Sequence, residues 1–145
     1  MLSMLLFVLY LGVLAYLLFF SEAYGRTVNR SEYQYNLTLF REIKRFFQYR
    51  ELLGTRVVLV NIVGNVVAFV PFGIFLPLLS CRMRNLFLVL LATFGFSVVI
   101  EALQLIYKVG TFDVDDLFLN TLGGAVGYLL FCVQGYRRKR AAGIK

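Results

Sequence analysis

Residues 57–79 read VVLVNIVGNVVAFVPFGIFLPLL, a stretch without a single charged side chain. A transmembrane helix needs about 20 largely apolar residues, so this stretch predicts a membrane-spanning helix. Three more apolar stretches, separated by charged or glycine-bearing segments, lie at about residues 2–20, 86–107 and 117–135. The chain is therefore expected to be an all-α membrane protein, with four transmembrane helices in a single domain covering residues 1–145.

The composition agrees with a membrane fold and excludes some kinds of catalytic and metal site. Hydrophobic residues make up 60% of the chain and its mean hydropathy is +0.77, whereas soluble domains contain roughly 45–50% apolar residues. The absence of His excludes His-based catalytic triads and His metal sites. Cys81 and Cys132 lack a CxxC spacing, and we interpret both as apolar filler.

The placement of Lys and Arg predicts that both termini are cytoplasmic in a bacterial cell membrane. Positive charges in the loop 80–85 and in the tail after residue 135 would then lie inside, whereas the loop 108–116, with one Lys and three Asp, would lie outside. Residues 21–56 would also be outside although they hold seven positive charges, and a loop of this length is weak evidence for orientation. The uncharged first helix lacks the basic start of a signal peptide and is expected to remain as an anchor.

The long first loop contains an amphipathic pattern. Apolar Leu39, Phe40, Ile43, Phe46 and Phe47 recur at helical spacing, while the opposite face carries Arg41, Lys44, Arg45 and Gln48. This pattern predicts a helix over about residues 37–50 that lies in the outer membrane interface. Arg41, Lys44 and Arg45 are its expected contacts with the membrane surface, and the basic excess of +7 suits anionic lipid.

Polar side chains inside a bilayer are costly, so each is a candidate site residue. In the predicted topology such residues converge at the outer ends of three helices, and they are Asn61 and Asn65, Glu101 and Gln104, and Asp113, Asp116 and Asn120. We interpret these seven as a ligand-binding site. The amides could instead join neighbouring helices, and the aspartates could cap the fourth helix.

The same part of the chain contains two other patterns, a spacing of two glycines and a cluster of acidic residues. Gly123 and Gly127 form a GxxxG spacing, which predicts close helix packing. Any bound metal would be a divalent cation held by the hard oxygen ligands of Asp113, Asp115, Asp116 and Glu101, although the sequence does not require a cofactor.

Three motifs in order resemble the VanZ family. They are NIVGNVVAFVPFG at 61–73, EALQ at 101–104, and FDVDD at 112–116 followed by NTLG at 120–123. The resemblance covers about residues 56–135. It implies a four-helix bacterial membrane protein whose relatives are associated with reduced susceptibility to teicoplanin and related lipoglycopeptide antibiotics.

Our leading hypothesis is a non-enzymatic membrane factor that binds an amphiphile at the outer leaflet and so lowers engagement of the antibiotic. One alternative is a metal-dependent enzyme acting on lipid head groups, although no catalytic residue is placed by a motif. Another is a structural subunit of a larger membrane complex. The expected partners are membrane lipid or a lipid-linked ligand rather than nucleic acid, and the oligomeric state stays open.

Overall fold

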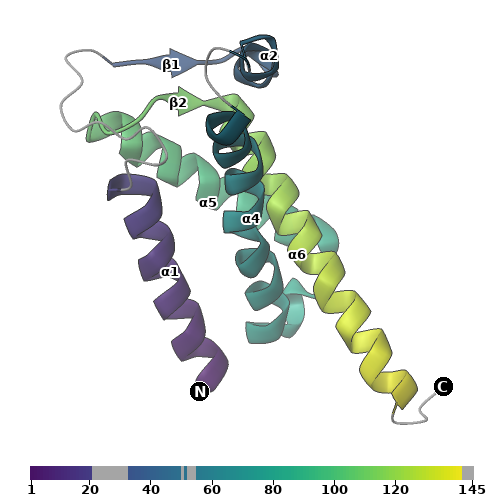
Figure 1. The fold of residues 1–145 in the computed structure, drawn as a ribbon. Coiled ribbons are helices and arrows are strands. Elements are labelled where there is room, and N and C mark those ends of the chain that lie inside the picture. Colours follow the sequence, from purple (N-terminus) through teal and green to yellow (C-terminus); the bar gives the residue numbers. More distant parts are fainter. Residues whose placement is uncertain (21–32, 50, 52–54, 142–145) are drawn as a thin grey trace.

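The computed structural model describes residues 1–20, 33–49, 51 and 55–141. Four helices in this part of the chain are long and apolar enough to cross a membrane, which confirms the predicted all-α membrane fold (Figure 1). In chain order the elements are α1 Leu2–Phe20, β1 Tyr35–Asn36, α2 Arg41–Gln48, α4 Thr55–Leu79, the 3₁₀ turn η2 Cys81–Met83, α5 Leu86–Ile106, β2 Phe112–Asp113 and α6 Val114–Ala141.

The bounds of α6 and α2 differ most from the sequence-based prediction, and α6 also continues to Ala141, beyond its predicted end near residue 135. Helix α6 begins at Val114 rather than near residue 117, so Asp115 and Asp116 occupy its first turn, where acidic groups are favoured by the exposed N–H groups. Helix α2 is shorter than predicted because Phe40 adopts a left-handed conformation with φ 64°. A non-glycine residue in that conformation cannot continue an α-helix.

Glycines set the distance between α4 and α6. A Cβ atom on Gly127 would lie 2.1 Å from the carbonyl oxygen of Val70, and one on Gly73 would lie 2.0 Å from that of Gly124. No side chain fits at such distances, so the two backbones touch directly. The predicted role of the GxxxG spacing in helix packing is confirmed.

Helix α1 covers the side of α4 and α5. Leu14 and Leu18 are buried against Phe69, Phe72 and Ile100. The outward faces of the helices instead leave large apolar side chains exposed, such as Leu9 and Leu91. Such an apolar exterior would be costly in water and is expected where lipid surrounds the protein.

The short strands and α2 gather at one end of the bundle, whereas α1 begins and α6 ends at the other (Figure 1). Strands β1 and β2 pair in parallel, with Tyr35 opposite Phe112 and Asn36 opposite Asp113. The first loop is thereby joined to the turn that starts α6. We call this the polar end of the molecule.

Candidate functional site

Asp115 holds α2 in place at the polar end. Its carboxylate, on α6 and only 1% exposed, accepts hydrogen bonds from the backbone N–H groups of Phe40, Glu42 (2.8 Å) and Ile43 (3.1 Å). The first N–H groups of a helix need outside acceptors, and Phe40 at the N-cap position offers no side-chain hydrogen bond. A carboxylate from another element therefore caps α2.

Asp113 ties the first loop to the bundle. Its Oδ1 accepts hydrogen bonds from Asn36 Nδ2 at 3.0 Å and from the backbone N–H of Asp115 at 2.9 Å. Burial raises the pKa of Asp113, and the negative charges of Asp115 and Glu42 raise it further, whereas the two hydrogen bonds act in the opposite direction. In turn, the backbone N–H of Asp113 donates to Glu101 Oε2 at 3.1 Å.

The remaining predicted site residues link helices to one another. Asn65 Nδ2 on α4 lies 2.5 Å from Asp116 Oδ1 on α6, and Asn120 Nδ2 on α6 donates to Ser97 Oγ on α5 at 2.8 Å. These bonds match the reading of the amides as links between packed helices.

Gln104 on α5 links its helix to α1 in a similar way, by a hydrogen bond. Gln104 Nε2 donates to the carbonyl oxygen of Leu18 at 2.9 Å. Gln104, Glu101 and Asn120 are at most 2% exposed. Asn61 is half-buried on α4. A ligand approaching from outside the bundle would therefore not meet the three buried residues directly.

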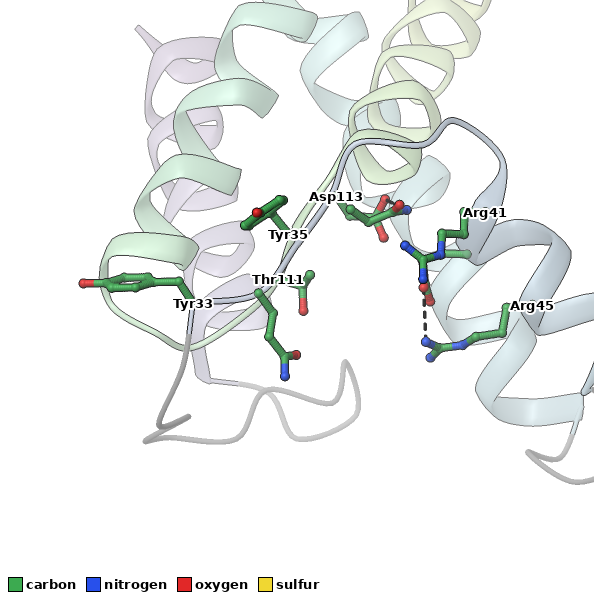
Figure 2. Close-up of a pocket in the computed structure, with 9 residues that line it drawn as sticks. Tyr33, Tyr35, Arg41, Arg45, Thr111 and Asp113 are labelled. Atoms are coloured by element: carbon green, nitrogen blue, oxygen red, sulfur yellow. Dashed lines mark hydrogen bonds and ion pairs between the residues drawn. The ribbon is translucent and has the colours of Figure 1, made fainter.

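A pocket of about 480 Å³ opens between β1, α2 and the turn before β2. We call it the polar pocket, and its lining residues are Tyr33, Gln34, Tyr35, Asn36, Arg41, Glu42, Arg45, Thr111 and Asp113. Figure 2 shows the two tyrosines on one side, the two arginines on the other, and Asp113 between them. Of the seven residues predicted to bind a ligand, only Asp113 lines this pocket.

The other lining residues were not predicted to bind a ligand, and all of them except Thr111 belong to the first loop. Asn36 is 4% exposed and bonds to Asp113, but a strand of two residues does not indicate in the sequence which segment it pairs with. The contact of Arg41 and Arg45 with the membrane surface stays a prediction, and the structure places both side chains on the pocket wall. The signal available in the sequence was the alternation of polar Gln34, Asn36 and Thr38 with Tyr35, Leu37 and Leu39, which is typical of a short strand.

The polar pocket is lined by two cations, Arg41 and Arg45, and by two acids, Glu42 and Asp113. Arg45 Nη1 lies 3.1 Å from Glu42 Oε1, and this pair is largely exposed on the arginine side, so it is a weak ion pair. Arg41 makes no ion pair with any residue that the structure describes. Its guanidinium is therefore available to a carboxylate or phosphate. The exposed ring of Tyr35 offers a flat apolar face, whereas the ring of Tyr33 has the Lys108 ammonium 4.8 Å from its centroid.

The acidic residues proposed as cation ligands do not form a metal cluster within the described ranges. No group of three or more His, Cys, Asp or Glu side chains there is arranged to hold a metal ion. Both Asp115 oxygens face the N–H groups of α2. Asp115 consequently has a structural partner in the position where the sequence allowed a cation.

The chain is similar to known proteins of the VanZ/LLP1 family. The profile of the VanZ/LLP1 family matches residues 7–135. The chain is 31% identical over 132 residues to Protein VanZ of Enterococcus faecium, an alignment that covers 87% of this chain and 71% of the relative. No solved structure matches the chain.

Proposed function

Because this chain belongs to the VanZ family, we propose that it lowers susceptibility to teicoplanin-type lipoglycopeptides by binding an amphiphile at the outer leaflet through the polar pocket. The observation that carries the proposal is the pocket itself, with Arg41 unpaired among the described residues on one wall and tyrosine rings on the other. It joins a cation, an acid and aromatic faces at the edge of the apolar bundle.

The charge distribution supports an outward-facing pocket. Arg82 and Arg84 lie at the end of the bundle opposite the polar end, in the turn between α4 and α5, and more positive charges follow residue 135. Short loops rich in Lys and Arg stay cytoplasmic. The polar pocket would then face the outer leaflet, with both termini inside.

In this proposal the predicted site residues have two different roles. Asp113 and Arg41 contact the amphiphile. Buried Glu101 and Asp115 position the loop that carries the pocket, because Glu101 accepts a hydrogen bond from the backbone N–H of Asp113 and Asp115 caps α2. A substitution at Glu101 or Asp115 would therefore act indirectly, through the position of this loop and of α2.

Antibiotic susceptibility of a Gram-positive host tests the proposal. Cells expressing the wild-type chain should tolerate more teicoplanin than cells with an empty vector, with little change for vancomycin, a glycopeptide without the acyl chain. Arg41→Gln should remove most of this protection. The matched control is Arg82→Gln, which makes the same charge change at the opposite end of the bundle.

Equal amounts of each variant must reach the membrane for the comparison to count. Protection by the wild type that Arg41→Gln leaves intact would contradict a role for the pocket. If the wild type gives no protection at all, the proposed role in susceptibility fails for this chain.

A further inference from the structure

Two more hollows lie beside α2, and they differ sharply in chemistry. The first, which we call the basic pocket, has a volume of about 350 Å³ and is lined by Thr38, Leu39, Arg41, Lys44, Arg45 and Gln48. The second, the apolar groove, has a volume of about 310 Å³ and is lined by Leu39, Phe94, Val114, Leu117, Phe118 and Thr121. Leu39 lines both, so the two hollows are neighbours.

Charge identifies what the basic pocket would hold. Three cations line it and no acidic residue does, because Glu42 lines the polar pocket instead. Guanidinium and ammonium groups together suit a phosphate, which accepts several charge-assisted hydrogen bonds. Arg41 and Arg45 line both the basic pocket and the polar pocket, so a group bound by them would have polar space on its other side.

The groove is suited to a hydrocarbon chain. Phe94 on α5 and Phe118 on α6 are both more than 40% exposed, and they lie on the outer faces of spanning helices. Phe40 meets Phe118 edge to face with ring centroids 5.4 Å apart, which packs the start of α2 against α6. The apolar groove thus begins at the α2 N-terminus, next to the basic pocket.

We infer that the basic pocket and the apolar groove together bind one phospholipid-type molecule, with its phosphate on Arg41, Lys44 and Arg45 and an acyl chain running past Leu39 into the groove. The part of the head group beyond the phosphate enters the polar pocket. This inference rests on the proposed function, because it names the chemical class of the amphiphile. The shared lining residues, Leu39 for the groove and the basic pocket and Arg41 and Arg45 for the basic and polar pockets, place the three hollows next to one another.

The chain contains no Trp, so a single introduced Trp can report on the groove. Phe94→Trp places the reporter in the groove, and Phe87→Trp places a control on the lipid-exposed surface of the same helix, outside the groove. Brominated acyl chains quench Trp fluorescence on contact. The purified variants in neutral detergent would be titrated with brominated phosphatidylglycerol and, separately, with diacylglycerol carrying the same chains.

For Phe94→Trp, the concentration of phosphatidylglycerol that quenches half of the Trp fluorescence should be at least about tenfold lower than that of diacylglycerol. For Phe87→Trp the two concentrations should be similar. Combining Arg41→Gln, Lys44→Gln and Arg45→Gln should abolish the preference. Combining Arg82→Gln, Arg84→Gln and Arg137→Gln, which removes the same charge from exposed positions elsewhere, should preserve it.

Equal quenching by the two lipids at Phe94→Trp would overturn the inference, since the groove would then contact only surrounding lipid. Displacement of the lipid by glycerol phosphate at comparable concentration would also overturn it, because the site would then recognise free phosphate. Cells protected from teicoplanin by a chain that shows no lipid preference would refute this inference and leave the proposed function standing. A lipid preference without protection would support the inference and refute the proposed function.

Discussion

At the scale of single residues, Asp115 has the most specific role in the structure. One buried carboxylate satisfies three N–H groups at the start of α2, across more than seventy positions of the chain. Asp115 also lies in the first turn of α6, where the exposed backbone N–H groups favour negative charge. Its charge therefore stabilises two helices at once.

Asp115→Asn should release the start of α2. The amide keeps the shape of the side chain but loses the negative charge and one acceptor oxygen, and hydrogen bonds to charged groups contribute roughly 1.5–3 kcal/mol each. Amide hydrogen exchange at Phe40, Glu42 and Ile43 should accelerate at least about tenfold. Glu42→Gln is the control, because it removes a charge from α2 itself and breaks only the weak ion pair with Arg45. Unchanged protection in Asp115→Asn would contradict the capping role.

Asp113 should make stability depend on pH. Its pKa is raised above the ordinary value of 3.8, chiefly by burial, so the folded chain holds this proton more tightly than the unfolded chain. The resulting stabilisation is fully present below pH 3.8 and is lost as the pH rises through the raised value.

The melting temperature in detergent, compared between wild type and Asp113→Asn, isolates this contribution. The wild type should lose stability relative to the variant as the pH is raised from about 4 to 7. Glu42→Gln should reduce the dependence, because one of the charges that raises the pKa is removed. A difference that stays constant across this range would contradict the assignment.

At the scale of helices, the closest contact is between α4 and α6. Gly127→Ala would place a methyl group against the carbonyl oxygen of Val70, and overpacking of this kind costs typically 1–3 kcal/mol. We expect a melting temperature several degrees lower. Gly95→Ala is the matched control, because a Cβ there meets nothing within 4 Å. Equal stability of the two variants would show that the contact can relax.

The helices could be predicted because their signal is local. A long apolar run such as residues 57–79 specifies a span by itself, and the spacing of Gly123 and Gly127 specifies a packing face. The polar residues at 65, 101 and 116 could also be predicted to meet at one end, since the topology brings their helix ends together.

The pocket could not be predicted in the same way. It depends on the pairing of Asn36 with Asp113, two residues far apart in the chain, and on a helix whose cap is supplied by Asp115. Neither contact leaves a periodic pattern. The carboxylates were predicted to gather at one end of the helices, and they lie together at the polar end. Most of the side chains predicted to bind a ligand are buried between helices.

At the scale of the whole molecule, the proposals depend on which side of the membrane the polar end faces. The structure puts α2 and η2 at opposite ends of α4, so labels at these two places should react from opposite sides. Cys81 in η2 is exposed and forms no disulfide, and it provides a natural label at the end opposite the pocket.

The measurement uses a membrane-impermeant maleimide on intact cells, with Cys132→Ser to leave Cys81 as the one thiol. Cys81 should react only after the membrane is permeabilised. In a second variant, Cys81→Ser, Cys132→Ser and Gln48→Cys together move the thiol to the exposed end of α2, which should react in intact cells. Because the single spanning helix α4 separates α2 from η2, the reverse pattern would place the polar pocket in the cytoplasm. The amphiphile would then have to be met at the inner leaflet, where a lipoglycopeptide acting outside the cell does not bind.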